Sequence, residues 1–282
     1  MKKLKDYNND DLKHLQRVEL KILKDVISIC ENHNLKYYAY GGTALGAIRH
    51  GGFIPWDDDV DIVMFRDDYE KLLKIMETEL SDEYYVLNFR KQKYYCYSFT
   101  EVCLKGTSFH NLDEYILQYD KGICIDIFPL DNVPKSRLKQ IIHHYRVTIL
   151  YHLVVNSIHK INTPNKILSL IHSITHYTLK AIPGYKFLKK RYYKCLIKYN
   201  KKETDYATVF FSQVDFLNFG KYGFFEKKDF EPTKKVKFEN IEINIQNNYD
   251  KILTTYYGDY MTLPPKEKRY NNNIDILDFG KY

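Results

Sequence analysis

The sequence predicts an α/β protein in which a mixed sheet is covered by helices and interrupted by a helical insertion. Segments with helical periodicity alternate along the chain with short segments rich in Tyr, Phe and Val, which pleated strands favour. Residues 132–202 then show three helical stripes in succession and contain no Asp or Glu. With 282 residues, of which 44% are hydrophobic, the chain is long enough for one large domain that carries such an insertion.

The first elements lead to a turn that contains two glycines. Apolar side chains follow helical spacing over residues 10–32, and residues 36–40 have the composition of a short strand. Gly41 and Gly42 follow, where the chain is expected to turn tightly. Residues 43–50 are then expected to form a short helix.

Four aspartates come next, at positions 57, 58, 59 and 61. If residues 57–65 form a strand, then Asp57, Asp59 and Asp61 project from the same face. Three carboxylates on one face repel each other strongly in a low-dielectric site, and a folded chain tolerates them when a cation lies among them. Oxygen ligands suit a hard cation, so the pattern predicts a site for Mg²⁺ or Mn²⁺.

The glycine pair supplies the second half of a candidate site. Backbone N–H groups at a tight turn and helix start bind phosphate oxygens, so Gly41, Gly42 and Thr43 are expected to hold phosphate. Arg49 is expected to neutralise phosphate charge. An Asp run alone is commonly a solvated loop, and a glycine pair alone is commonly a plain turn. Together, a phosphate turn and a carboxylate metal site favour phosphoryl or nucleotidyl transfer.

The elements after the aspartates are predicted from the same patterns. Helices are expected at 66–80 and 248–257, with three more in the insertion, where Pro164, Pro183 and Gly184 separate them. Strands are expected at 84–89, 94–101, 102–105, within 122–134, and at 205–213 and 236–245, the last with a turn near Glu239-Asn240. Residues 219–228 are expected to form a loop or lid, and the last dozen residues a mobile or loosely docked tail.

A further carboxylate lies within an apolar run in the second half of the core. Asp126 stands between Ile125 and Ile127, where a carboxylate is costly unless it meets a cation or a donor. Capping of a local loop is one reading. We favour the other, in which an adjacent strand brings Asp126 to the site of Asp59 and Asp61. Asp131, after Pro129, is expected to be a turn residue, with a substrate contact as the lesser alternative.

The charge of the chain is segregated. Residues 132–202 carry fifteen Lys and Arg, whereas the rest of the chain has 28 basic and 36 acidic residues, a net charge of −8. Such segregation indicates an anionic partner for one region. A helical subdomain with a solvated basic face is the alternative, although such faces usually mix both signs. We therefore expect binding to an anionic membrane surface, which replacement of Lys189, Lys190 and Arg191 by Glu should weaken.

Cysteine usage and the N-terminus bear on the compartment. The five cysteines are odd in number and irregularly spaced, which predicts free, reduced thiols in core positions. No apolar run approaches the length that crosses a bilayer, and the N-terminus lacks the apolar segment of a signal peptide. The protein is therefore expected in the cytoplasm, with peripheral attachment to the inner membrane face.

Three motifs carry a resemblance to a known family. The stretch GGTALGAIRHGGFIPWDDDVDIVM, followed by RDDYEKL, resembles the LicD family, which includes relatives of fukutin and is similar in fold to the nucleotidyltransferase superfamily. The run I-D-I-F-P-L-D and the C-terminal pattern N-Y-D-x-x-L-x-x-x-Y-G-D-Y-M-x-x-P-P also resemble it. The resemblance covers the first half well, the C-terminal block moderately and the middle poorly. It implies a nucleotidyltransferase-like mixed sheet with a helical basic insertion.

The resemblance also implies an activity. Members of the family move phosphocholine, or another phospho-alcohol, from a CDP-activated donor to a sugar hydroxyl, often of a lipid-linked glycan. On this basis Asp59, Asp61 and Asp126 are expected to bind Mg²⁺ or Mn²⁺, with Asp57 as an additional ligand. Asp126 is also expected to act as general base. A basic residue near a Thr occurs at a similar place in relatives, which suggests a donor-phosphate role for Lys105, although a plain surface lysine is the simpler account.

The expected organisation is a catalytic core at 1–131, the basic insertion at 132–202, and a segment at 203–282 that completes the core and ends in a tail. One rival function is transfer of a nucleoside monophosphate to a small hydroxyl compound, with pyrophosphate as by-product. A second is a non-catalytic glycan- or membrane-binding module, against which the aspartate set argues. A nucleic-acid polymerase is the weakest, because no base-reading motif is present, so no nucleic-acid partner is expected. The alcohol, the acceptor sugar and the oligomeric state are left open.

Overall fold

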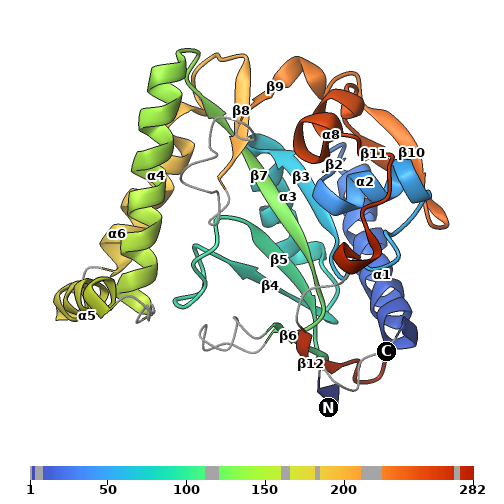
Figure 1. Ribbon diagram of the computed structural model, residues 1–282, viewed down its shortest axis with the longest axis horizontal. Coiled ribbons are helices and arrows are strands. Elements are labelled where there is room, and N and C mark those ends of the chain that lie inside the picture. Colours follow the sequence, from blue (N-terminus) through green and yellow to red (C-terminus); the bar gives the residue numbers. More distant parts are fainter. Residues whose placement is uncertain are drawn as a thin grey trace.

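The computed structural model describes residues 2–3, 9–111, 121–159, 166–181, 185–210, 224–269 and 274–282. Its helices are α1 (Asn9–Asn32), α2 (Gly41–His50), α3 (Arg66–Glu79), α4 (Arg137–Ile158), α5 (Lys166–Ala181), α6 (Tyr185–Leu196) and α8 (Tyr249–Tyr257). Its strands are β1 (Lys2–Lys3), β2 (Tyr38–Ala39), β3 (Asp61–Phe65), β4 (Tyr84–Asn88), β5 (Thr100–Leu104), β6 (Ser108–Asn111), β7 (Cys124–Val133), β8 (Tyr206–Val209), β9 (Phe225–Glu226), β10 (Lys234–Phe238), β11 (Ile241–Ile245) and β12 (Ile274–Asp278). The predicted α/β class is confirmed (Figure 1).

A mixed sheet forms the centre of the molecule. Its strands follow the order β2-β3-β7-β5-β4, and β8 and β9 extend it beside β7. Only β3 and β7 run parallel, and the other neighbouring strands are antiparallel. Ile62, Met64 and Ile127 pack under α1 and α3 on one face. Val63 and Phe128 belong to a second cluster on the opposite face, so the sheet buries apolar side chains on both sides.

Elements of the C-terminal part pack on the core. The hairpin of β10 and β11 turns at Glu239 and Asn240, where a turn was predicted, and the φ of Glu239 is 55°. Within the predicted strand at 205–213, residues 206–209 form β8, and residues 211–213 lie outside the described residues. The first half of the predicted loop or lid at 219–228 also lies outside them, whereas its second half forms β9 and the start of a 3-10 helix, which the loop prediction did not give. Helix α8 follows close to the predicted range and packs near α2. Helix α2, which contacts β3, therefore also contacts α8 from the C-terminal part of the chain.

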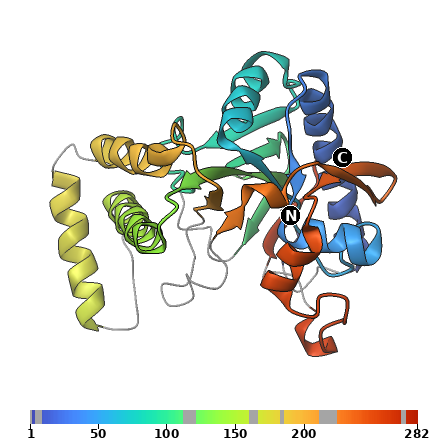
Figure 2. The ribbon, with the colours of Figure 1, turned by 90° about the horizontal axis from the view of Figure 1, so that it is seen from above.

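Helices α4, α5 and α6 occupy the segment where three helices were expected. Helix α4 contacts both α5 and α6. Val147, Val154, Leu188 and Tyr192 from α4 and α6 join a buried cluster with Leu87 of β4, so these two helices cover the β4–β5 end of the sheet. Helix α5 lies outermost, on the far side of α4 from the sheet (Figure 2). Within the described residues, no helix is both long and apolar enough to cross a membrane.

The expectation of a loosely docked tail is wrong for residues 274–282. Ile274–Asp278 forms β12, which pairs with β6 on one side and β1 on the other. Leu277 is buried, and the Phe279 ring stacks on His14 with centroids 3.9 Å apart. Apolar residues predominate in this segment, which completes a small sheet by pairing with the edge of β6, with an irregularity in the register between Ile274 and Ile276.

Asp131 is not a turn residue, which corrects a second expectation. It lies within β7 and is buried, and the Arg66 guanidinium donates to its two carboxylate oxygens at 2.8 and 2.6 Å. The Asn200 amide also donates to Asp131 Oδ1 at 2.5 Å. A bidentate, buried ion pair of this kind joins α3, β7 and the segment after α6.

The cysteines give a third correction. Cys103 and Cys124 stand directly opposite each other in β5 and β7, with Cα atoms 4.1 Å apart, and are joined by a disulfide. Cys30, Cys96 and Cys195 are free thiols, as predicted for all five. The pairing follows from the antiparallel register of two strands that are separated along the chain, which spacing in the sequence does not reveal.

Candidate active site

The aspartate segment is held by the first helix. The Gln16 side-chain amide of α1 donates to the carbonyls of Ile54 and Asp57, at 3.2 and 2.9 Å. Residues 57–60 therefore form an anchored loop before β3, and the strand predicted over 57–65 begins only at Asp61. The backbone N–H of Asp61 donates to Thr43 Oγ1 at 2.9 Å. Thr43 is buried, and its hydroxyl positions the start of β3, while its expected phosphate contact stays a prediction.

Asp126 lies beside the aspartate loop. In the parallel pair of β3 and β7, Asp61 stands directly opposite Asp126, and the N–H of Asp126 donates to the Val60 carbonyl at 2.9 Å. On the other side of β7, Glu101 of β5 is the antiparallel partner of Asp126. Directly paired residues project from the same face of a sheet. Asp61, Asp126 and Glu101 therefore form a row of carboxyl groups across three strands.

The glycine pair lies against two of these carboxylates. A Cβ atom on Gly41, whose φ is 54°, would approach Asp61 Oδ2 to 3.0 Å. A Cβ atom on Gly42 would approach Asp57 Oδ2 to 2.4 Å, closer than real contacts allow. Gly41 and Gly42 thus let the carboxylates reach the N-terminus of α2, where the helix dipole favours negative charge. The same backbone is available to a phosphate oxygen.

The carboxyl groups perturb one another's ionisation. Burial, followed by repulsion from Asp59 and Asp58, raises the pKa of Asp57 to about 8. Burial raises the pKa of Asp59, although its hydrogen bond with Asp57 and the charge of Lys121 oppose this. Burial and the charges of Asp59, Asp126 and Asp57 hold the pKa of Asp61 well above its usual range. Each of these side chains keeps some accessible surface, so a small cation has access to them.

These residues fit a hard divalent cation in their chemistry. They supply only carboxylate oxygens, and a cation would neutralise the negative charge whose burial, together with repulsion at Asp57 and Asp61, raises their pKa values. In the described ranges, no three His, Cys, Asp or Glu side chains already have the arrangement of a finished metal site. Burial and the neighbouring Asp59 and Asp58 raise the pKa of Asp57 to about 8, so a cation that binds there would displace a proton.

Two guanidinium groups stand on one side of the carboxylates. Arg49 Nη1 donates to the Tyr260 carbonyl at 2.8 Å, and both burial and the charge of Arg269 lower the pKa of Arg49. Arg269 donates to the Pro264 carbonyl at 2.7 Å and lies over the Trp56 ring, 5.5 Å from its centroid. The sequence pointed to Arg49 but not to Arg269, because only the folded C-terminal segment brings it here.

Tyrosines stand close to the same carboxylates. Burial and the charges of Asp61, Asp57 and Asp59 raise the pKa of Tyr257. The hydroxyls of Tyr40 and Tyr256 lie 3.4 Å apart, and their ring centroids are 6.3 Å apart. Helix α8 therefore supplies aromatic side chains that the sequence could not single out among 27 tyrosines.

Two more ionisable side chains at the site were not predicted. Glu19 of α1 is buried, and its Oε2 has no hydrogen-bond partner among the described residues. Burial and then repulsion from Asp59, Asp58, Asp57 and Asp126 raise its pKa. Lys121 is also buried and pairs with Glu101 at 2.8 Å. A signal for Glu19 existed, since it lies on the apolar stripe of the first helix one turn after Leu15 and Gln16.

Lys105 is the predicted residue that the fold does not bring to this cluster. It follows β5, four residues beyond Glu101, which corresponds to about 13 Å along an extended strand. Its side chain is exposed at a turn that Gly106 completes. This position fits a plain surface lysine better than a ligand of the donor phosphate.

We expect the metal-free protein to lose stability as the pH rises. The pKa of Asp57 is raised from 3.8 to about 8, and the pKa values of Asp59 and Asp61 are raised too. The folded chain therefore binds protons that the unfolded chain has released, and the free energy of unfolding falls through this window. Melting temperatures in a chelator between about pH 5 and about pH 8 test this. Asp57→Asn should flatten the profile, and a melting temperature that rises with pH would contradict the prediction.

A pair of glycine substitutions separates the site from the fold. Gly42→Ala should weaken Mg²⁺ binding with little loss of stability, because its Cβ meets only the Asp57 carboxylate, which can rotate away. Gly46→Ala should instead destabilise by about 1–3 kcal/mol, since its Cβ would lie 2.5 Å from the Gly52 carbonyl oxygen. Calorimetric metal titration and thermal melting of both variants check this, and unchanged metal affinity in Gly42→Ala would argue against a site at the glycine pair.

Comparison with known proteins gives a family for this arrangement. A model described as LicD/FKTN/FKRP, nucleotidyltransferase domain, matches residues 34–163. The ribitol 5-phosphate transferase FKRP of Mus musculus and of Homo sapiens is 44% identical over 43 residues, 15% of this chain and 9% of those proteins. The lipopolysaccharide cholinephosphotransferase LicD of Haemophilus influenzae is 30% identical over 270 residues, which cover 93% of this chain and 96% of that protein. A match along nearly the whole of both chains shows that this protein belongs to the LicD family.

Proposed function

We propose that this protein transfers a phospho-alcohol from a CDP-activated donor to a sugar hydroxyl of a cell-surface glycan or its lipid-linked precursor. Among the phospho-alcohols, we propose phosphocholine. The family makes the chain a phosphotransferase. A relative that matches 93% of this chain is a lipopolysaccharide cholinephosphotransferase, and two shorter matches are ribitol 5-phosphate transferases. The observation that supports the reaction most is the row of carboxyl groups beside the N-terminus of α2, with Asp61 opposite Asp126.

Asp59, Asp61 and Asp126, with Asp57, would hold Mg²⁺ or Mn²⁺ in this proposal. A cation bound there supplies charge that polarises the phosphorus centre and stabilises the departing CMP. The backbone N–H groups of the glycine pair bind donor phosphate oxygens at the positive end of α2. Arg49, joined by Arg269, offsets phosphate charge that one divalent ion leaves uncompensated.

Asp126 has the position for general-base catalysis. It lies in the middle of the row, between Asp61 and Glu101, and retains accessible surface. In the proposed step it accepts the proton of the acceptor hydroxyl while the sugar oxygen bonds to phosphorus and the bond to the CMP oxygen breaks. No covalent enzyme intermediate is needed, because donor and acceptor react directly.

The tyrosines favour phosphocholine among the possible groups. Tyr40 and Tyr257 stand next to the carboxylates, Tyr256 packs against both of these rings, and aromatic faces attract a quaternary ammonium. Ribitol and glycerol carry hydroxyls in place of that charge and would gain less from these rings. The same carboxylates and glycines also suit the rival transfer of a nucleoside monophosphate, so the products decide between them.

A panel of donors tests the proposal. The protein is incubated with Mg²⁺, a glycan acceptor and CDP-choline, CDP-ribitol or CDP-glycerol, and CMP release is measured. CDP-choline should react fastest, and Tyr256→Leu should slow it more than CDP-glycerol. Release of pyrophosphate from a nucleoside triphosphate, without CMP from any donor, would support the nucleotidyltransferase. No release of either would support a non-catalytic module.

A further inference from the structure

One side of α5 is apolar and uncovered. The opposite side packs on α4, where Asn156 donates to the His172 carbonyl at 3.1 Å and His176 Nδ1 lies 2.7 Å from the Asn156 carbonyl. The uncovered side chains recur at intervals of three and four residues and therefore form one stripe. They are Ile167, Leu170, Ile171, Ile174 and Tyr177, each more than half exposed, at 72, 61, 52, 56 and 60%.

Exposed apolar side chains are concentrated in this part of the molecule. Of the twelve large hydrophobic side chains that are exposed among the described residues, nine lie between Leu138 and Phe187. Isolated exposed apolar residues are ordinary on any protein surface, but a contiguous stripe marks a contact with something else. The stripe on α5 therefore needs an occupant.

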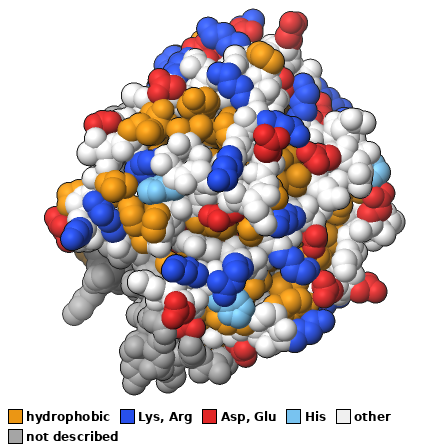
Figure 3. Space-filling view, turned by 90° about the vertical axis from the view of Figure 1, so that its right-hand side faces the viewer, with side chains coloured by type: hydrophobic (Ala, Val, Ile, Leu, Met, Phe, Trp, Pro, Cys, Tyr) orange, Lys and Arg blue, Asp and Glu red, His pale blue; other side chains and the backbone are white. Residues whose placement is uncertain are grey.

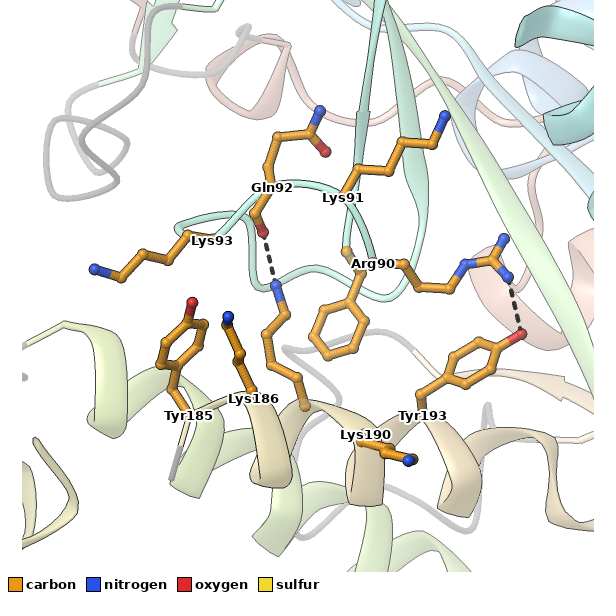
Figure 4. A pocket seen from close by; sticks show the side chains of 10 residues that line it. Arg90, Lys91, Gln92, Lys93, Tyr185, Lys186, Lys190 and Tyr193 are labelled. Carbon is orange, nitrogen blue, oxygen red and sulfur yellow. Dashed lines mark hydrogen bonds between the residues drawn. The ribbon is translucent and has the colours of Figure 1, made fainter. Parts of the chain in front are cut away.

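A basic pocket lies at the start of α6. It has a volume of about 410 Å³ and opens between α6 and the loop after β4 (Figure 4). Six cationic side chains line it, together with Phe89, Gln92, Tyr185 and Tyr193: Arg90, Lys91, Lys93, Lys186, Lys189 and Lys190. Arg90 and Lys91 form ion pairs with Glu70 and Glu77 at 2.7 and 2.6 Å. An anion in the pocket would therefore be bound chiefly by the remaining lysines.

Lys189 has a structural role in this pocket, which changes the expectation from the sequence. Its ammonium donates to the carbonyls of Gln92 and Tyr95 at 2.7 and 3.1 Å and lies 4.4 Å from the Phe89 ring centroid. Burial lowers its pKa to about 8. Replacing Lys189 by Glu, as the sequence alone suggested, would break this anchor. Lys186 and Lys190 are exposed, so replacing them would leave the Lys189 anchor intact.

The stripe and the pocket are neighbours. Only three residues lie between Ala181, where α5 ends, and Tyr185, where α6 begins, so these two residues lie within about 14 Å and the C-terminal end of the stripe is close to the pocket. Phe187, at 63% exposure, stands between the two exposed lysines on α6. We call this combination the α5–α6 surface. It consists of Ile167, Leu170, Ile171, Ile174, Tyr177, Lys186, Phe187 and Lys190.

We propose that the α5–α6 surface docks on an anionic lipid bilayer. An apolar helix face enters the interface between headgroups and acyl chains, and the flanking lysines contact lipid phosphates. A second copy of this chain fits less well, since two acid-free segments with fifteen cations each would repel. On the side of the molecule opposite α4–α6, acidic and basic side chains are interspersed (Figure 3). Docking through α5 and α6 would bring a lipid-linked acceptor to the protein.

Vesicle sedimentation tests the proposal, with the full chain and without donor or acceptor, so the result does not depend on the transferase reaction. The protein should sediment with vesicles that contain phosphatidylglycerol, but not with pure phosphatidylcholine, and high salt should weaken binding. Lys186→Gln with Lys190→Gln should weaken it at least about tenfold. Ile171→Asn with Ile174→Asn should weaken it as well, because the stripe no longer inserts.

Matched variants elsewhere serve as controls. Lys13→Gln with Lys237→Gln removes two exposed cations, and Met261→Asn removes an exposed apolar side chain. Neither should change sedimentation. Thermal melting checks that the α5 variants fold, and the lysine pair decides the outcome if they do not. Equal recovery with both vesicle types, or a dimer in light scattering that the α5 variants dissolve, would overturn membrane docking.

Discussion

Asp61→Asn should abolish most Mg²⁺ binding and reduce turnover by about 10²-fold or more, since a metal ion contributes several kcal/mol of charge stabilisation in the transition state. Asp61 begins β3, faces Asp126 across the parallel pair, and has its pKa raised by three neighbouring carboxylates. Asparagine at position 61 carries no negative charge, so the cation would lose one of its charged ligands. The fold should survive, because the substituted amide keeps the shape of the side chain.

For the same variant we also predict a gain in stability when no metal is present. Without metal, Asp61→Asn should melt at a higher temperature than the unmodified protein, because one of several repelling carboxylates is gone. With saturating Mg²⁺, the order should reverse, since only the unmodified protein gains stability from binding. Calorimetry and melting in chelator and in Mg²⁺ measure both effects. Full activity in Asp61→Asn would refute the site.

Asp126→Asn should lower turnover by roughly 10²-fold with little change in melting temperature. The position in β7 is fixed by the backbone, through the N–H donated to Val60, and the side chain faces the other carboxylates. The amide can no longer accept the proton of the acceptor hydroxyl. Steady-state CMP release and thermal melting measure the two effects separately.

Asp131→Asn is the control on the same strand. Asp131 is buried in a bidentate pair with Arg66, so its substitution leaves the buried guanidinium with only its longer contact to Glu70, at 3.2 Å, and should destabilise by about 3 kcal/mol. It should change turnover only through the amount of folded protein. If Asp126→Asn behaved like Asp131→Asn, unfolding readily and regaining turnover once stabilised, Asp126 would be structural.

Local sequence patterns were enough to predict the helices and the turn that surround the candidate site. Residues 10–32 have an apolar stripe of helical period, and α1 spans Asn9–Asn32. The glycine pair and the apolar residues after it predicted a turn and a helix, and α2 begins at Gly41. These elements follow from backbone sterics and from burial of one face, both of which are properties of neighbouring residues.

Partners distant in the chain were decided by tertiary contacts. Arg269 reaches Arg49 only because the C-terminal segment folds back over α2, and its own neighbours in the sequence give no sign of this. Cys103 meets Cys124 through the register of β5 and β7. Asp131 carried a turn signal from Pro129, but Arg66 offers it a buried ion pair, and that contact outweighs the local preference.

The sequence by itself determined the family, the α/β class and the carboxylates that form the candidate site. It could do so because glycine at a turn, aspartates before a strand and Asp126 in an apolar run are each local patterns that favour a phosphate and metal site. The tertiary structure decided which side chains face one another: Glu19 under the aspartates, tyrosines of α8 beside them, and Lys189 turned inward while α5 stays apolar and exposed. Those pairings depend on strand register and helix packing, which are set by contacts between residues far apart in the chain.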